Sequence, residues 1–127
     1  MALARIALVD DEASVRVALG RLLRLADYEV LAYASGEEFL AALAACMPDC
    51  ALLDVHMPGL TGIQVQLRLQ VDRVKLPVVF ITASDDRAIE RSALEAGGLR
   101  VLRKPFSNHE LLAGIAFALQ TAAKPAR

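Results

Sequence analysis

The sequence has no tryptophan, and aromatic residues make up only 5% of its 127 positions. Because 56% of the residues are hydrophobic, the core must be built mainly from aliphatic side chains. No apolar run reaches the roughly 18 residues that a membrane-spanning helix needs. Residues 1–7 also lack the long apolar segment of a secretory signal. These absences favour a cytoplasmic protein with no membrane span.

Cysteine and net charge are also scarce. The two cysteines, Cys46 and Cys50, are too few for a disulfide framework. Zinc would need further thiolate or imidazole ligands, and the neighbouring sequence supplies none. We therefore interpret both cysteines as reduced packing thiols. The formal net charge of −1 provides no bulk attraction to nucleic acid, so direct nucleic-acid binding is not expected.

Short apolar runs alternate with longer amphipathic segments along the chain. The apolar runs are typical of strands buried in a parallel sheet, and they cover residues 5–9, 28–32, 50–54, 77–81 and 99–102. Helices are expected over residues 11–26, from 35, over 61–73, over 85–96 and from 107. Asp11 is the expected N-cap of the first helix.

Five strands alternating with five helices predict an α/β fold with a doubly wound parallel sheet. Right-handed crossovers favour the flavodoxin-like strand order 2-1-3-4-5. A chain of this length forms one domain with a substantial core. We assign residues 1–121 to this domain and residues 122–127 to a tail or the start of a linker.

Residues 61–73 carry two conflicting signals. Apolar and polar residues alternate strictly from Ile63 to Val71, which is the period of a half-buried strand. A helix is nevertheless predicted, because parallel strands need a crossover between them and Gln, Leu and Arg are good helix formers. In that helix Ile63, Leu67 and Val71 would be buried, with Val65 and Leu69 on its flank.

Acidic side chains stand where two of the strands end. Asp10 and Asp11 follow the first strand and Asp54 ends the third; in the order 2-1-3-4-5 these strands are neighbours at the switch point, where α/β proteins bind ligands. Alone, Asp54 could equally be a turn or helix-capping residue. Three carboxylates together repel one another unless a cation lies among them, and hard oxygen ligands suit Mg²⁺. The acids therefore predict a magnesium site.

The fourth and fifth strands contribute groups of another kind. Thr82, Ala83 and Ser84 follow the fourth strand, and Lys104 follows the fifth. A divalent cation and a lysine can neutralise phosphoryl oxygens, while hydroxyl and backbone N–H groups donate hydrogen bonds to them. A carboxylate such as Asp54 can itself accept the phosphoryl group as an aspartyl phosphate. The combination predicts a phosphoryl-transfer site.

These residues resemble the receiver domains of two-component response regulators, and the resemblance covers nearly the whole chain. It rests on four motifs in order, which are Asp10-Asp11, Asp54 with Met57-Pro58 and Gly62, Thr82-Ala83, and Lys104-Pro105-Phe106. Each motif alone is weak, but the four at these spacings are highly specific. The spacing is most similar to regulators that control transcription, which implies a transcriptional output domain or partner outside this chain.

The resemblance implies a role for each acid. Asp54 would be the phosphoacceptor, and Mg²⁺ would be held by Asp10, Asp11, Asp54 and the main-chain carbonyl of His56. The phosphoryl donor would be a phosphohistidine on a sensor histidine kinase. The domain would then be no enzyme in the usual sense, but a phosphoacceptor with at most slow self-catalysed phosphorylation and dephosphorylation.

The resemblance also implies that Thr82, Ala83 and Lys104 bind the phosphoryl oxygens. The peptide bond before Pro105 would be cis and would aim Lys104 into the crevice. One position departs from the family pattern. Three residues before the lysine the family usually has Tyr or Phe, whose ring moves with the threonine on phosphorylation, whereas this chain has Val101. The switch formed by Thr82 and Val101 is therefore expected to differ from the usual one, although the chemistry does not need the ring.

Two other functions remain open at this point. One is a magnesium-dependent aspartyl-phosphate phosphatase, in which His56 would replace the usual second Asp as the acid–base group. The other is a degenerate receiver that only binds partners. His56 and Ser84 flank the site, either as solvated loop residues or as groups that control water access to the phosphoryl group. In the family that the chain resembles, the fourth helix, fifth strand and fifth helix often form the dimer or partner surface, which implies a possible homodimer here.

Overall fold

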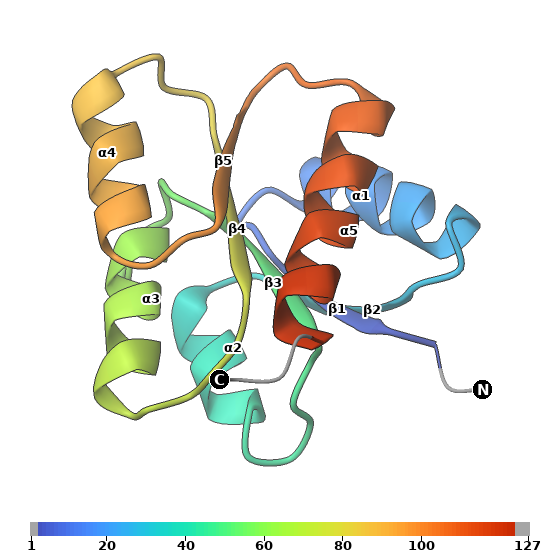
Figure 1. Cartoon of the computed structure of the whole chain (residues 1–127), viewed down its shortest axis with the longest axis horizontal. Helices are drawn as coiled ribbons and strands as arrows, with labels where there is room; N and C mark the ends of the chain where they lie inside the picture. Colours follow the sequence, from blue (N-terminus) through green and yellow to red (C-terminus); the bar gives the residue numbers. More distant parts are fainter. Residues whose placement is uncertain (1–2, 124–127) are drawn as a thin grey trace.

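The computed structural model describes residues 3–123, in which strands and helices alternate strictly. The strands are β1 (Arg5–Val9), β2 (Glu29–Tyr33), β3 (Cys50–Asp54), β4 (Val78–Thr82) and β5 (Arg100–Arg103). The helices are α1 (Ala13–Leu25), α2 (Gly36–Ala42), α3 (Gly62–Val71), α4 (Arg87–Glu95) and α5 (Asn108–Ala123). The predicted α/β fold is confirmed (Figure 1).

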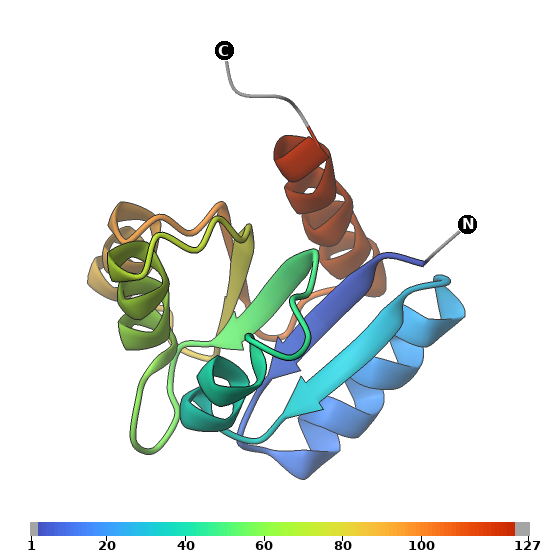
Figure 2. The ribbon, with the colours of Figure 1, turned by 90° about the horizontal axis from the view of Figure 1, so that it is seen from below.

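The strands form one sheet in the order β2-β1-β3-β4-β5, and every neighbouring pair is parallel. This is the predicted flavodoxin-like order. Figure 2 shows β2 at the edge of the sheet, beside β1. The central strands β3 and β4 are buried at every position, because helices cover both faces of the sheet. Since all strands run the same way, their carboxyl ends share one edge.

The helices form two layers, with α1 and α5 on one face of the sheet and α2, α3 and α4 on the other (Figure 1). Alternate residues of each central strand supply the two cores. In β1, Ile6 and Leu8 pack into the core under α1 and α5, while Ala7 and Val9 pack into the opposite one. Both cores are mainly aliphatic, as the composition predicted.

Residues 61–73 contain the predicted helix, α3, but the predicted buried face is wrong. Val65 and Leu69 are buried, whereas Leu67 and Val71 are 46% and 76% exposed. The cause is Gly62, which lies on the same helical face as Val65 and Leu69. A Cβ atom at Gly62 would collide with the main-chain carbonyl of the last residue of β3. The helix is rotated so that its glycine meets β3, and this rotation turns the other apolar stripe outward.

The start of α1 also differs from the prediction. Its N-cap is Glu12, which makes no side-chain capping bond, rather than Asp11. The N–H of Glu12 instead donates to Asp10 Oδ1 at 2.9 Å. Because Asp10 supplies this bond, Asp11 is left exposed at the carboxyl edge of the sheet.

The end of α5 bears on the predicted domain boundary. The helix continues to Ala123, two residues into the segment assigned to a tail, and residues 124–127 lie outside the described residues. The division at residue 121 therefore stays a prediction. Over residues 3–123, no helix combines the length and apolar character that crossing a membrane requires.

Candidate functional site

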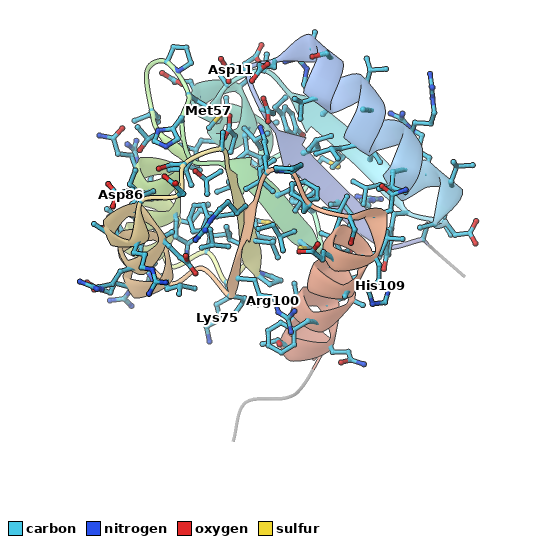
Figure 3. The ribbon with its side chains drawn as sticks, turned by 90° about the horizontal axis from the view of Figure 1, so that it is seen from above. Asp11, Met57, Lys75, Asp86, Arg100 and His109 are labelled. Atoms are coloured by element: carbon cyan, nitrogen blue, oxygen red, sulfur yellow. The ribbon has the colours of Figure 1, made fainter. Side chains whose placement is uncertain are left out.

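Asp10, Asp11 and Asp54 meet at the carboxyl edge of the sheet, where β1 and β3 end side by side. One carboxylate oxygen from each lies within 4.8 Å of the others. Asp10 is fully buried and Asp54 is 5% exposed, while Asp11 faces solvent. Figure 3 shows Asp11 near Met57, which lies in the loop after β3. Acids that are far apart in the sequence thus form one cluster, called here the acid cluster.

Asp10 is held in place on three sides. Its Oδ1 accepts the N–H of Glu12 at 2.9 Å, and its Oδ2 lies 3.4 Å from Lys104 Nζ. Its main-chain carbonyl accepts a bond from the guanidinium of Arg16 at 2.7 Å. The sequence did not predict this contact, because nothing in the spacing distinguishes Arg16 from the other arginines of α1. The first two contacts satisfy a fully buried carboxylate, and the third holds the main chain that carries it.

The ends of β4 and β5 place a hydroxyl and an ammonium beside the acid cluster. Thr82 is 2% exposed, and its Oγ1 accepts the N–H of Ser84 at 3.1 Å. The N–H of Lys104 donates to the main-chain carbonyl of Thr82 at 2.7 Å, so the two residues are directly linked. The side chain of Lys104 is 23% exposed, and its peptide bond to Pro105 is cis. This edge of the sheet therefore carries the acid cluster at the ends of β1 and β3, and a hydroxyl and an ammonium at the ends of β4 and β5.

The charge of Asp54 depends strongly on its surroundings. Its pKa is raised to about 6, first by burial and then by the neighbouring carboxylate of Asp10. Lys104 and the N–H of His56, which lies 3.4 Å from Oδ1, oppose this rise in pKa. Burial and a neighbouring negative charge both disfavour the ionised form of a carboxyl group. A cation in the acid cluster would favour the ionised form of Asp54.

The acid cluster fits a hard divalent cation. All its donors are carboxylate oxygens, which are the ligands that Mg²⁺ takes in proteins, and Mg²⁺ usually retains several waters beside them. Asp11 is the exposed member of the cluster. Asp10, Asp11 and Asp54 are therefore the residues that would hold the ion.

The remaining predicted site residues lie at the rim. His56 and Ala83 are exposed, and Ser84 is half-buried. Ser84 Oγ accepts the N–H of Asp86 at 3.1 Å, and Asp86 is the N-cap of α4. Figure 3 shows Asp86 at the beginning of that helix. Ser84 thus connects the end of β4 to the start of α4.

Val101 lies in the middle of β5, half-buried against the core under α2, α3 and α4. Its register partner on β4 is Phe80, which is fully buried. A Cβ atom at Gly98 would lie 2.5 Å from the Phe80 ring, so this ring is packed tightly. The aromatic ring at this level of the sheet is therefore enclosed in the core, and the β5 position carries only an aliphatic side chain.

The fold and the crevice together define the class. A doubly wound five-stranded sheet carries, at one edge, an acid cluster opposite a threonine and a lysine, which is an arrangement suited to binding a phosphoryl group with a divalent cation. The family model of the response regulator receiver domain matches residues 6–116. The chain belongs to this family, whose members are receiver domains of two-component systems. Such domains accept phosphoryl groups from sensor histidine kinases and are not enzymes in the usual sense.

Two relatives are described as transcriptional regulatory proteins. The chain is 38% identical over 111 residues to TdiR of Thauera aromatica, covering 87% of this chain and 49% of that protein. It is 32% identical over 119 residues to FixJ of Bradyrhizobium diazoefficiens, covering 94% of this chain and 58% of that protein. The chain thus spans about half the length of the curated relatives it matches.

Solved structures agree with these matches. The chain is similar to the crystal structure of FixJ-N with a TM-score of 0.89 and 26% identity, over 100% of both chains. It is similar to the response regulator StyR with a TM-score of 0.88 and 38% identity, over 96% of this chain and 62% of that one.

Proposed function

We propose that this chain is a phosphorylation-dependent signalling switch in which Asp54 accepts a phosphoryl group from a phosphohistidine of a sensor histidine kinase. The observation that carries the proposal is the position of Asp54 at the end of β3, inside the acid cluster and on the strand beside β4, which ends at Thr82. An oxygen of Asp54 forms the bond to phosphorus while the P–N bond to the kinase imidazole breaks, and the imidazole takes up a proton.

The acids of β1 prepare Asp54 for this reaction. Asp10 and Asp11, with Asp54 and the main-chain carbonyl of His56, hold Mg²⁺ in the proposed site. When bound, the ion supplies positive charge for the phosphoryl oxygens. The bonds that hold Asp10 in place keep its carboxylate oriented before the ion or the donor arrives. Ionised Asp54 is the nucleophile, and a bound cation would counteract the burial and the neighbouring carboxylate of Asp10 that raise its pKa.

The opposite side of the crevice binds the transferred group. Thr82, the main-chain N–H of Ala83 and Lys104 are proposed to bind the phosphoryl oxygens. The N–H to carbonyl bond between Lys104 and Thr82 supports this role, because it keeps the two residues together. His56 and Ser84 at the rim are proposed to control water access, and with it the slow self-catalysed loss of the phosphoryl group.

The proposed output lies outside this chain and is transcriptional, in line with the descriptions of TdiR and FixJ and with the share of their length that the chain covers. A homodimer through α4, β5 and α5 is proposed as one way to reach it. This surface carries the Arg103–Glu90 ion pair at 3.2 Å, the exposed Leu94, and Arg100 stacked 4.4 Å from the ring centre of Phe117. A kinase partner of this kind would place the domain in the cytoplasm.

Intact-mass spectrometry after incubation with Mg²⁺ and acetyl phosphate tests the proposal. We expect one phosphoryl group per chain for the native protein and none for Asp54→Asn. Asp27→Asn is the matched control, since Asp27 is an exposed acid in a left-handed conformation that asparagine also adopts, and it should be labelled normally. Labelled Asp54→Asn would disprove the assignment. Continuous phosphate release would favour the phosphatase, and an unlabelled native chain the degenerate receiver.

A further inference from the structure

Helix α1 and the edge strand β2 form a groove whose lining includes none of the acid-cluster residues. Its walls are the side of α1 from Ala13 to Leu25 and Ala32 of β2, and its volume is about 520 Å³. Both elements lie at the β2 end of the sheet (Figure 2). We call it the α1–β2 groove.

The lining of the α1–β2 groove is cationic. Arg16, Arg21 and Arg24 line it, and no acidic residue does. Within residues 3–123, ion pairs join other arginines to acids, as in Arg103 with Glu90 at 3.2 Å, but no carboxylate pairs with Arg21 or Arg24. Because the chain as a whole has a net charge of −1, this concentration of unpaired positive charge is local. It complements an acidic ligand.

Apolar side chains stand beside these arginines. Val17 and Leu25 also line the groove and are 60% and 77% exposed. Leu25 is the most exposed large hydrophobic residue among those the structure describes. A ligand that covers this surface must therefore carry apolar groups as well as carboxylates, which a protein segment does and a simple anion does not.

One arginine is positioned by a glycine within the helix. The Arg24 guanidinium lies over Gly20, where an added Cβ would stand 3.2 Å from Nη1. Glycine weakens a helix relative to alanine. Here it leaves room for the guanidinium to lie along α1, where Arg24 lines the groove.

The β2 side of the groove offers unpaired main-chain groups. The N–H of Glu29 donates to the carbonyl of Ala4, and the carbonyl of Tyr33 accepts the N–H of Asp10, so both residues turn their main-chain groups toward β1. These groups alternate in direction along a strand, and an edge strand leaves one set unpaired. The N–H and C=O of Ala32 therefore point to the open edge, and Ala32 lines the groove.

We propose that the α1–β2 groove docks an acidic segment of a partner protein, which adds to the sheet as an extended strand beside β2. Main-chain hydrogen bonds to Ala32 provide affinity, as in other cases of strand addition. Carboxylates of the segment pair with Arg21 and Arg24, and its apolar side chains cover Val17 and Leu25. This interaction is independent of phosphoryl transfer at Asp54.

A titration of the ¹⁵N-labelled chain with a model peptide tests the proposal. The probe has about eight residues, a length suited to one strand, and repeats Glu-Glu-Val-Val so that each face of a strand presents both residue types in turn. We expect amide shifts confined to α1 and β2 at about 0.15 M salt. The control peptide has Lys in place of Glu and should produce none. No shifts with the acidic peptide, or shifts centred elsewhere, would overturn the proposal.

Three variants separate the two parts of the interaction. Arg24→Glu should weaken binding at least about tenfold, because it replaces attraction with repulsion. Lys75→Glu makes the same change in charge in an exposed loop away from α1 (Figure 3) and should bind normally. Ala32→Pro removes the outward N–H without removing a bond to β1, which an edge strand tolerates, and should also weaken binding. The ¹⁵N spectrum reports whether each variant remains folded.

Full affinity in Ala32→Pro would show that the peptide binds without adding a strand and would overturn the proposal. The same holds if inorganic phosphate alone shifts the same amides and displaces the peptide, because the groove would then be a small-anion site. Self-association of the unliganded chain that sedimentation detects and that Ala32→Pro abolishes would identify a second copy as the occupant and would equally overturn it.

Discussion

The two sides of the proposed phosphoryl site are built differently. On the β1–β3 side, Asp10 and Asp54 are almost fully enclosed, and the start of α3 presses against the main chain of Asp54. On the β4–β5 side Thr82 is equally buried, but the next position that would carry a signal outward is the small, half-buried Val101. The residues proposed to accept the phosphoryl group and hold the cation are tightly packed, whereas Val101, the residue proposed to transmit the signal, has a small side chain. The two functions of a receiver can therefore be perturbed separately.

The closest packing on the β1–β3 side gives the largest expected effect. In Gly62→Ala the new methyl group meets the carbonyl of Asp54 and the Cα of Val55. Because both contacts are main-chain atoms, they cannot move aside as a flexible side chain would. We expect the variant to lose about 3 kcal/mol of unfolding free energy, measured by urea denaturation.

Gly114→Ala on α5 is the matched control for Gly62→Ala. Its Cβ would come no closer than 3.7 Å to any neighbouring atom, the nearest being in Leu102 and Val79. Since the site is the interior of a helix, alanine should stabilise the protein by about 0.5–1 kcal/mol. Equal losses of stability in both glycine variants would refute the claim that the β3 side is the more tightly packed.

The second prediction concerns the cation on the same side. With Mg²⁺ at a hundredfold excess over its dissociation constant, the native chain should gain about 2.7 kcal/mol of stability, because the ion removes repulsion within the acid cluster. Asp11→Asn should lose most of this gain, while Asp27→Asn, outside the acid cluster, should retain it. Thermal melting with and without Mg²⁺ measures the effect. A melting temperature that millimolar Mg²⁺ leaves unchanged would rule out the proposed metal site.

Much of this crevice was predictable from the sequence, because it depends on where strands end. Apolar runs located the strands, and parallel strands bring their carboxyl ends to one edge. Asp10, Asp54 and Lys104 could thus be assigned to one site although they are far apart in the chain. Parallel strands need a crossover connection between them, and this requirement correctly predicted a helix at α3 although the alternating pattern there favours a strand.

Other features depended on how elements rotate against one another, which periodicity does not determine. Helix α3 has two apolar stripes, and only the approach of Gly62 to β3 selects Val65 and Leu69 as the buried one. That signal was present in the sequence, since both residues lie one or two turns from a glycine in a recognisable motif. The bond from Arg16 to Asp10 had no such signal, because it depends on how α1 meets the sheet.

The third prediction is the pH dependence of stability without metal. The pKa of Asp54 is raised from 3.8 to about 6 in the folded chain, so between about pH 4 and pH 6 the folded state binds more protons than the unfolded state. Stability contributed by this group is therefore lost as pH rises through that window. Asp54→Asn lacks this titrating carboxyl group. As pH rises from about 4 to about 6, its free energy of unfolding should therefore increase by about 1–2 kcal/mol relative to that of the native chain, allowing for solvent screening.

Urea denaturation in the presence of a chelator, at several pH values, measures this difference. Asp27→Asn serves as the control, because Asp27 is an exposed acid outside the acid cluster. If the difference in unfolding free energy between Asp54→Asn and the native chain is the same at pH 4 and pH 7, the pKa of Asp54 is not raised by its burial and its neighbour Asp10.

The smallest expected effect lies on the β4–β5 side, in the transmission of the phosphorylation signal. Val101 has a stiff, short side chain, and the nearest ring in register, Phe80, is enclosed in the core. The bond from the N–H of Ser84 to Thr82 Oγ1 leaves a main-chain route from Thr82 to the start of α4. A ligand shifts an equilibrium only by its difference in interaction with the two states. Without a mobile ring, that difference should be small.

We therefore expect beryllofluoride, a phosphoryl mimic, to change self-association of the native chain by only about 1 kcal/mol, or about fivefold, the low end of typical coupling energies. Val101→Tyr should enlarge the response, because the half-exposed position on β5 gives a ring two environments to occupy. Sedimentation of both chains with and without the mimic measures the coupling, and Asp54→Asn should show none. Strong mimic-driven dimerisation of the native chain that the tyrosine weakens would mean that Val101 is no handicap. The signal would then travel along the main chain of residues 82–84 into α4. The two sides of the site would in that case differ in the size of their side chains but not in how well they transmit the signal.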